Sequence, residues 1–201
     1  WFNDHLITFD LRVTAPEKWH SVSQGKRITD SEADGKNISE WHSPEPMDEA
    51  YLISAEFHQY KIKQGNVNLY AYMRTPDDSL AMKYLNTTGQ YLEMYNRLIG
   101  RFPYSKFALI ENFWETGYGM PSFTLLGSQV IRFPFILHSS YPHELLHNWW
   151  GNSVFVNYET GNWCEGITVY LADHLIKEQR EQGAEYRRTT LQGYTDYVND
   201  E

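Results

Sequence analysis

The chain has 201 residues, of which 41% are hydrophobic and 16% aromatic, and its formal net charge is −9 at pH 7. This length and composition suit one good hydrophobic core or about one and a half domains, and they exclude a disordered chain. The acidic charge, spread without a long run of one sign, argues against nucleic acids and acidic membrane surfaces as partners.

The first sixty residues have the patterns of β-structure. Apolar and polar residues alternate from Leu6 to Thr14, which predicts a half-buried strand that ends at Pro16. Residues 24–50 are rich in Gly, Ser, Asp, Glu and Pro, so they predict turns between short strands. A further strand is predicted from Tyr51 to Tyr60.

A hairpin and a long helix are predicted next. Gln64-Gly65-Asn66 predicts the turn into a strand over residues 67–74, where apolar residues alternate again. Thr75-Pro76-Asp77-Asp78 combines a capping hydroxyl, a first-turn proline and early acids, so it predicts the start of a helix that Gly100 ends. One face of this helix carries residues at helical spacing that predict a core: Leu80, Tyr84, Thr87, Tyr91, Tyr95 and Leu98.

Two short strands, from Lys106 to Glu111 and over residues 123–126, are predicted before the pentapeptide His143-Glu144-Leu145-Leu146-His147. In a helix, the two histidines lie about 40° apart around the axis, so both imidazoles can bind a single Zn²⁺. Glu144 falls beside the metal, where it can take a proton from a bound water. The alternative, a solvated helix with unrelated charges, is disfavoured because this pattern is rare by chance.

Glu165 lies at the start of a second predicted helix, which ends before Gly183. Catalytic zinc sites usually combine three protein ligands with water, so one further ligand is needed downstream, and Glu165 can supply it. By itself, a glutamate at this position can be only a favourable partner of the helix dipole. Cys164, the only cysteine, is interpreted as a packed residue. The apolar side of this helix is predicted to comprise Ile167, Tyr170, Leu171, His174, Leu175 and Ile176.

Beyond the pentapeptide, the segments Trp149-x-Gly151-Asn152 and Glu165-Gly166-x-Thr168-Val169-Tyr170 are present. Together these motifs resemble those of the gluzincin metallopeptidases of the membrane alanyl aminopeptidase and leukotriene hydrolase family. The resemblance extends upstream through Phe102-Pro103-Tyr104 and more weakly through residues 9–22, so it covers most of the chain.

The resemblance implies an α+β fold with a thermolysin-like zincin catalytic domain preceded by part of a β-sheet domain. Residues 1–60 would form the carboxy-terminal part of the β domain, and residues 61–201 the catalytic domain, incomplete at its carboxy-terminal end. Peptides would be the substrates. One Zn²⁺ per chain would be bound by the residues that match the family's ligands, His143, His147 and Glu165, with Glu144 as the general base.

One departure from the family concerns substrate binding. The family reads Gly-x-Met-Glu-Asn-Pro in an edge strand that pairs with the substrate backbone, and its glutamate holds the substrate's free amino group. The corresponding segment, residues 117–124, has Met120-Pro121-Ser122 and lacks the Glu-Asn pair. Weak or no selection of free amino termini is therefore expected, unless Glu111 or Glu115 replaces that acid. The residues predicted to bind substrate in this strand are Gly117, Gly119, Met120 and Pro121.

Two alternatives to an aminopeptidase-like enzyme stay open. The missing acid favours an endopeptidase or another hydrolase that does not select free amino termini. A non-catalytic, zinc-bearing scaffold that holds a peptide on its edge strand is the other alternative, although the intact Glu144 favours an enzyme. The chain begins with Trp1 and not methionine, so we expect it to be part of a longer protein. No membrane span is recognisable in the sequence, and neither localisation nor oligomeric state is predicted.

Overall fold

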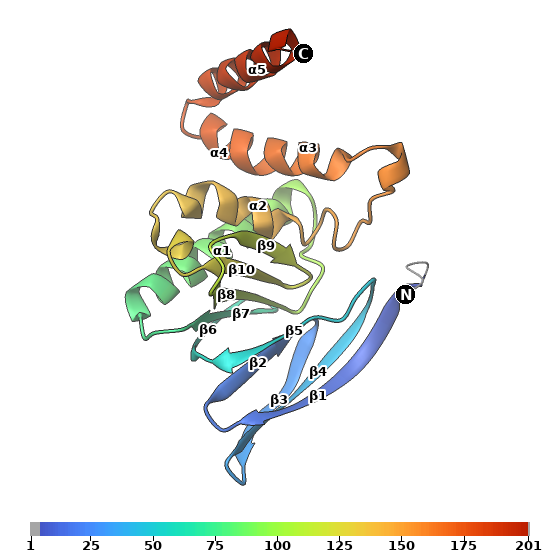
Figure 1. Cartoon of the computed structure of the whole chain (residues 1–201), viewed down its shortest axis with the longest axis vertical. Helices are drawn as coiled ribbons and strands as arrows, with labels where there is room; N and C mark the ends of the chain where they lie inside the picture. The colour runs from blue at the N-terminus through green and yellow to red at the C-terminus, as the bar shows by residue number, and fades with distance from the viewer. Residues whose placement is uncertain (1–4, 201) are drawn as a thin grey trace.

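Strands and helices occupy successive layers along the long axis of the molecule (Figure 1). The computed structural model describes residues 5–200. The strands of residues 7–56 lie at one end, a five-stranded sheet lies in the middle, and the helices of the last third lie at the other end. The α+β class predicted from the sequence is confirmed. No helix among the described residues combines the length and apolar character of a membrane span.

Two antiparallel sheets form the amino-terminal layer. One has the order β1-β4-β3, and the other pairs β2 with β5. Their strands are β1 (Ile7–Pro16), β2 (Trp19–Ser23), β3 (Lys26–Ala33), β4 (Lys36–Met47) and β5 (Leu52–Glu56). The alternation predicted for the first strand is confirmed, because Phe9, Leu11 and Val13 are partly buried between exposed neighbours.

One prediction for this layer is confirmed only in part, because the strands are longer than expected, and another is wrong. Residues 24–50 form the long hairpin of β3 and β4, which turns at Asp34 and Gly35 with positive φ angles of 52° and 70°. Because β3 is an edge strand with mostly exposed side chains, its polar composition resembles that of turns. Residues 51–60 are two strands that join different sheets, with only Phe57 between them, and so short a break leaves no mark in the local pattern.

The central sheet has the order β6-β7-β8-β10-β9. Its strands are β6 (His58–Gln64), β7 (Val67–Met73), β8 (Lys106–Asn112), β9 (Gly117–Met120) and β10 (Phe123–Gly127). The middle three strands are parallel, whereas β6 and β9 run antiparallel to their neighbours at the two edges. The predicted hairpin is confirmed between β6 and β7, where Gly65 has a φ of 57°.

β7 is buried on both faces, so the central sheet separates two hydrophobic cores. Successive side chains of a strand point to opposite faces. Leu69 and Ala71 therefore enter the larger core beneath the helices, whereas Tyr70 and Tyr72 enter the smaller core beside the amino-terminal layer. The predicted alternation in β7 therefore distinguishes residues that face the larger core from residues that face the smaller core. It does not distinguish buried residues from residues exposed to solvent.

Helix α1 (Asp78–Leu98) packs on the larger core, and the sequence places its cap incorrectly. Asp77, and not Thr75, caps the helix, because its Oδ1 accepts the backbone N–H of Leu80 at 2.9 Å. Leu98 is 56% exposed, contrary to prediction. The three tyrosines are buried as predicted, and each hydroxyl donates to a backbone carbonyl: Tyr84 to Ile131, Tyr91 to Leu137 and Tyr95 to Leu171. These bonds attach α1 to segments on both sides of the pentapeptide.

The last third of the chain is helical. Its elements are the 3-10 turns Val130–Arg132, Ile136–His138 and Tyr158–Thr160, the helices α2 (Ser140–Leu146), α3 (Trp163–Val169), α4 (Leu175–Glu178) and α5 (Gly183–Asp200), and the π-helical turn Tyr170–His174. The predicted second helix thus begins at Trp163 and contains a wider turn. Because that turn shifts the faces of the helix, Tyr170 is 62% exposed, contrary to prediction, while Ala172 is buried.

Candidate metal centre

Helix α2 presents the pentapeptide beside the edge of the central sheet. Tyr141 and Leu145 are buried in the larger core, so they fix this short helix against the sheet. His143 and Glu144 lie on its partly buried side, and His147 is its carboxyl-terminal cap. The two imidazole centroids are 5.0 Å apart. The motif is therefore helical, as the sequence predicts, and its two rings are neighbours.

Glu165 completes a group of three donors. It lies in the first turn of α3, where Asn162 Oδ1 accepts its backbone N–H at 3.5 Å. Its Oε2 is 3.3 Å from His143 Nε2, and its Oε1 is 3.5 Å from His147 Nε2. Tetrahedral ligands at about 2.0–2.1 Å from a metal lie about 3.3–3.4 Å apart, so these separations fit a zinc ion. Within residues 5–200 no other cluster of three or more potential ligands occurs.

The Nδ1 atom of each imidazole has a hydrogen-bond partner within the protein. His143 Nδ1 lies 3.2 Å from Asp173 Oδ2, and His147 Nδ1 lies 3.2 Å from the carbonyl oxygen of Trp150. The hydrogen bond to Asp173 raises the pKa of His143, although burial opposes this shift. Such contacts leave the Nε2 atoms free for a metal. Sequence reasoning missed Asp173, and its only signal was a carboxylate eight residues after Glu165 on the same helix.

The π-helical turn brings Asp173 to the metal side. In a regular α-helix, residues eight apart are offset by about 80° around the axis. The wider turn at Tyr170–His174 lies between Glu165 and Asp173 and reduces this offset, so both carboxylates reach His143.

Glu144 lies against strand β9. Two glycines allow this contact, since a Cβ on Gly117 would stand 3.1 Å from Glu144 Oε1, and one on Gly119 would stand 3.0 Å from Oε2. The backbone N–H of Gly119 also hydrogen-bonds to the Glu144 carboxylate. Burial raises the pKa of Glu144, and the two neighbouring histidines and this hydrogen bond partly offset the rise.

The three potential ligands, Glu144 and strand β9 all line one cavity of about 490 Å³. The four residues predicted to bind substrate, Gly117, Gly119, Met120 and Pro121, all line it together with the three potential ligands and Glu144. Asp48 and Tyr51, from the connection between β4 and β5, also line this cavity and were missed by sequence reasoning. Cys164 is buried, as predicted, with its Sγ 3.7 Å from His147 Nδ1.

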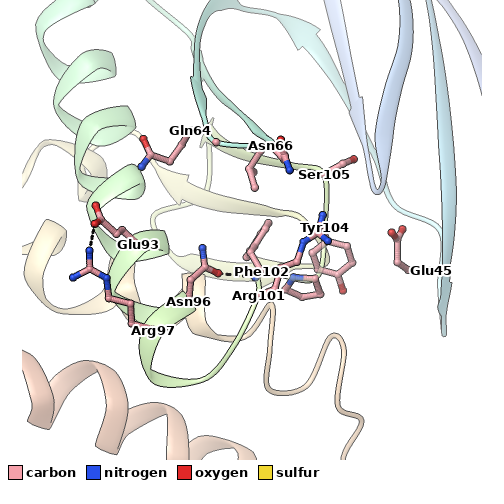
Figure 2. A pocket seen from close by; sticks show the side chains of 13 residues that line it. Glu45, Gln64, Asn66, Glu93, Asn96, Arg97, Arg101, Phe102, Tyr104 and Ser105 are labelled. Atoms are coloured by element: carbon pink, nitrogen blue, oxygen red, sulfur yellow. Dashed lines mark hydrogen bonds and ion pairs between the residues drawn. The ribbon is translucent and has the colours of Figure 1, made fainter.

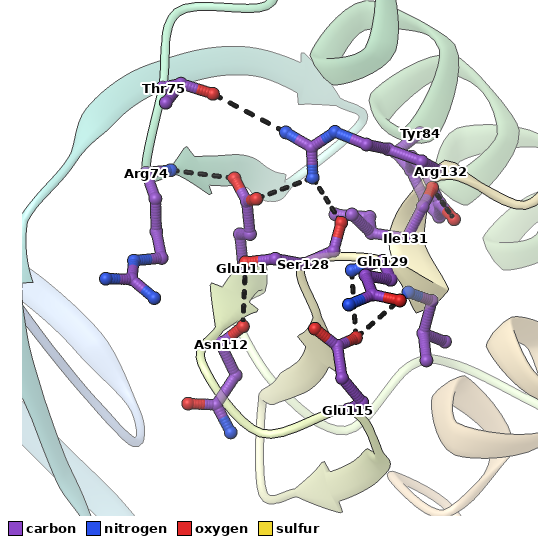
Figure 3. Close-up of polar contacts among 11 residues, drawn as sticks. Arg74, Thr75, Tyr84, Glu111, Asn112, Glu115, Ser128, Gln129, Ile131 and Arg132 are labelled. Carbon is purple, nitrogen blue, oxygen red and sulfur yellow. Dashed lines mark hydrogen bonds and ion pairs between the residues drawn. The ribbon is translucent and has the colours of Figure 1, made fainter.

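Glu111 and Glu115, the acids considered for amino-group binding, are occupied elsewhere (Figure 3). Glu111 is 3% exposed, and its two oxygens pair with Arg132 Nη1 at 2.6 Å and accept the N–H of Arg74 at 2.8 Å. Glu115 Oε2 accepts the backbone N–H of Gln129 at 2.8 Å. Neither side chain lines the cavity beside the potential metal ligands.

Figure 2 shows a larger cavity, of about 740 Å³, whose lining includes none of the three potential metal ligands. It is bounded by the β6–β7 turn, the end of α1 and residues 101–105. Glu93 pairs with Arg97, and Asn96 Oδ1 accepts the N–H of Phe102 at 2.7 Å. Size alone therefore does not identify the chemical centre, which we place at the smaller cavity because only that one contains the three converging donors.

No protein-family model matches the chain, and no curated protein matches it. Among solved structures, the chain is similar to an M1 zinc metallopeptidase from Deinococcus radiodurans, with a TM-score of 0.73 and 18% identity over 94% of this chain and 44% of that one. It is also similar to a mutant of a Deinococcus radiodurans M1 zinc metallopeptidase bound to a Tyr-Ser-Ala substrate, with a TM-score of 0.65 and 18% identity over 86% and 41%.

A third structure, of a two-domain M1 zinc metallopeptidase mutant bound to L-arginine, matches with a TM-score of 0.67 and 18% identity over 86% of this chain and 41% of that one. The chain therefore has the fold of the M1 zinc metallopeptidases. It spans less than half the length of these structures.

Proposed function

We propose that the chain carries the catalytic centre of a zinc-dependent peptidase in which His143, His147 and Glu165 bind one zinc ion and Glu144 is the general base. The observation that supports this best is the convergence of three donors within 4.8 Å of one another, with the Glu165 oxygens 3.3 and 3.5 Å from the two Nε2 atoms and with Glu144 outside the set but beside the same cavity. We also propose that residues 1–60 and 61–201 are the end of a β domain and a zincin catalytic domain. Residues 1–4 and 201 lie outside the described residues, and the central sheet begins at His58.

A zinc ion bound there would polarise the scissile carbonyl and acidify a water molecule. Asp173 and the carbonyl of Trp150 would hold the two imidazoles in the orientation that directs each Nε2 toward the metal. Glu144 would accept the proton of the attacking water and pass it to the leaving amine. Its carboxylate lies outside the three potential ligands but lines the same cavity, which suits this role.

The edge strand β9 would hold the substrate. β9 pairs with β10 on one side, so its other side can add an extended peptide through backbone hydrogen bonds. Gly117 and Gly119 bring this strand close to Glu144, which would set the peptide beside the general base. Peptide binding is consistent with the structural relative that is bound to a Tyr-Ser-Ala substrate.

The charge of the cavity favours the amino end of a peptide. Asp48 is the one carboxylate in its lining that is neither a proposed zinc ligand nor the proposed base, and no lysine or arginine lines it among the described residues. A substrate carboxylate would therefore lack a cationic partner on this wall, whereas an ammonium group would be attracted. We propose that Asp48 takes the place of the family's absent glutamate. This proposal departs from the expectation of weak selection, which rested on the missing Glu-Asn pair and considered only Glu111 and Glu115 as substitutes.

Metal analysis and turnover together test the zinc site and the base in the full-length protein. We expect stoichiometric zinc in the natural protein, a strong loss in His147→Ala, and retained zinc with turnover lowered by several orders of magnitude in Glu144→Gln. Equal zinc in the natural protein and His147→Ala would refute the ligand set. Zinc-loaded protein that cleaves neither free nor blocked peptides would favour the scaffold alternative.

A comparison of free and amino-acetylated peptides tests Asp48. We expect Asp48→Asn to raise KM for the free peptide by about tenfold and to leave cleavage of the acetylated peptide unchanged. Glu49→Gln is the matched control, because it removes the same charge from the next residue, whose side chain hydrogen-bonds Tyr51 and does not line the cavity. Equal effects of both substitutions, or no preference for free peptides in the natural protein, would contradict the role of Asp48.

A further inference from the structure

Lys106 is a fully buried lysine at the start of β8, with 1% of its surface exposed. Its Nζ donates to Ser122 Oγ at 2.8 Å and lies 3.2 Å from the carbonyl oxygen of Ser122. The same nitrogen lies 5.3 Å from the ring centroid of Trp41 and 5.2 Å from that of Phe123. In the described part of the chain it pairs with no carboxylate, so its hydrogen-bond partners are both on Ser122.

Ser122 occupies a backbone conformation that it does not favour. Its φ is 66°, in the left-handed region where a residue with a Cβ is strained and glycine is not. It follows Pro121 in the turn between β9 and β10, and it is completely buried. A strained conformation persists only where surrounding contacts hold it, and the two contacts from Lys106 are of this kind.

A third contact ties the same residue to the metal-binding segment. The backbone N–H of Ser122 donates to Asn148 Oδ1 at 2.8 Å. Asn148 directly follows His147 and is buried, and its Nδ2 donates to the carbonyl oxygen of Leu145 in α2 at 2.8 Å. The turn that ends β9 is thus held on one side by Lys106 and by the backbone N–H of Ala108, which donates to the Ser122 carbonyl at 3.1 Å, and on the other side by the end of α2.

We infer that Lys106 is a positioning residue. It holds the β9–β10 turn in place at Ser122 and so fixes the position of β9 relative to Glu144 and the zinc ligands. The inference rests on the proposed function, since β9 is proposed to hold the peptide. Lys106 touches no reacting atom. Through Ser122 it determines the position of β9, and β9 in turn determines where the bound peptide lies.

The test uses the zinc-loaded full-length protein and a tripeptide with a free amino terminus. Lys106→Met should raise KM by about tenfold, with a smaller change in kcat and no loss of zinc, because the ligands and Glu144 do not contact Lys106. It should also speed amide hydrogen exchange at Ser122, whose N–H bonds to Asn148. Because exchange is measured without turnover, this arm stays informative even if the protein proves not to be a peptidase.

A second substitution separates positioning from core packing. Glycine adopts a φ of 66° without strain, so Ser122→Gly combined with Lys106→Met should recover a large part of the lost substrate affinity and exchange protection.

Ser122→Ala provides a milder test that can be used if Lys106→Met does not fold. It leaves Lys106 in place, removes only the Oγ that accepts its hydrogen bond, and should give a smaller rise in KM. Thr124→Val is the matched control, since the buried Thr124 Oγ1 has no hydrogen-bond partner. Unchanged KM and exchange in Lys106→Met, or losses that Ser122→Gly does not reduce, would overturn the inference.

Discussion

At the scale of single residues, Lys106 links the stability of the protein to pH. Burial, reinforced by the nearby Arg27, lowers its pKa well below the ordinary value of 10.5. Between the lowered pKa and about 10.5, the unfolded chain therefore binds a proton that the folded protein does not. It follows that this lysine makes the protein more stable as the pH rises through that window, and less stable as the pH falls.

Urea unfolding of the natural protein and Lys106→Met at pH 7, 8 and 9 measures this contribution. We expect the unfolding free energy of the natural protein, minus that of Lys106→Met, to increase as the pH increases, because the variant has no lysine proton to release on folding. Other ionisable groups are common to both proteins, so their effects cancel in the difference. Parallel pH dependences would show that Lys106 keeps its proton in the folded state.

The residues of the metal centre differ in how far the sequence could predict them. His143, Glu144 and His147 lie within five positions on one helix, so their spacing fixes their relative placement. Asp48 reaches the same cavity from the connection between β4 and β5, far from the pentapeptide in sequence, and no local pattern reports such a contact. The failure at Glu111 and Glu115 has the same cause, because nearness in sequence to β9 did not place either carboxylate in the cavity.

At the scale of elements, the glycines of β9 determine how closely the strand approaches α2. A methyl group on Gly119 would stand 3.0 Å from both the carbonyl oxygen and Oε2 of Glu144, and 3.2 Å from the Cβ of His147. We expect Gly119→Ala to push β9 away and to lower kcat/KM by at least about tenfold, with zinc retained. Gly193→Ala in α5 is the control, since a Cβ there meets nothing within 4 Å. Full activity of Gly119→Ala would mean that β9 can shift without cost.

The cap of α1 provides a second test at this scale. Asp77→Ala removes the acceptor of the Leu80 N–H and should lower the unfolding free energy by about 1 kcal/mol. Thr75→Ala, at the position that the sequence suggested, should change it by less than about 0.5 kcal/mol. Urea unfolding of both variants distinguishes the two positions, and the reverse order would restore Thr75 as the cap.

The elements that the sequence predicts well are those with a sustained period. The alternation in β1 and the tyrosine face of α1 each extend over many residues, so single exceptions such as Leu98 do not hide them. The errors lie where one residue changes the outcome. Phe57 separates strands of different sheets, and the extra width of a single π turn redirects the second half of the helix that begins at Trp163.

At the scale of the whole molecule, a bound zinc ion would join α2 to α3, which the loop from Asn148 to Asn162 separates along the chain. Since the unfolded chain cannot assemble the site, zinc should raise the melting temperature by roughly 5–10 °C when present at about a hundred times its Kd. Calorimetry with a chelator and after zinc is restored measures this shift. His147→Ala should abolish it, whereas His42→Ala, at an exposed histidine of the amino-terminal layer, should preserve it. A shift that survives His147→Ala would place the stabilising metal elsewhere.

β7 belongs to both hydrophobic cores, and this sharing bears on how the chain can be divided. Removal of the strands before His58 would leave Tyr70 and Tyr72 of β7, together with Ile110 of β8 and Phe123 of β10, on one uncovered sheet face. A contiguous apolar face of this kind promotes self-association. The amino-terminal strands therefore cover an apolar sheet face and keep the protein soluble. We expect a shortened protein that starts at His58 to precipitate even though it keeps every zinc ligand.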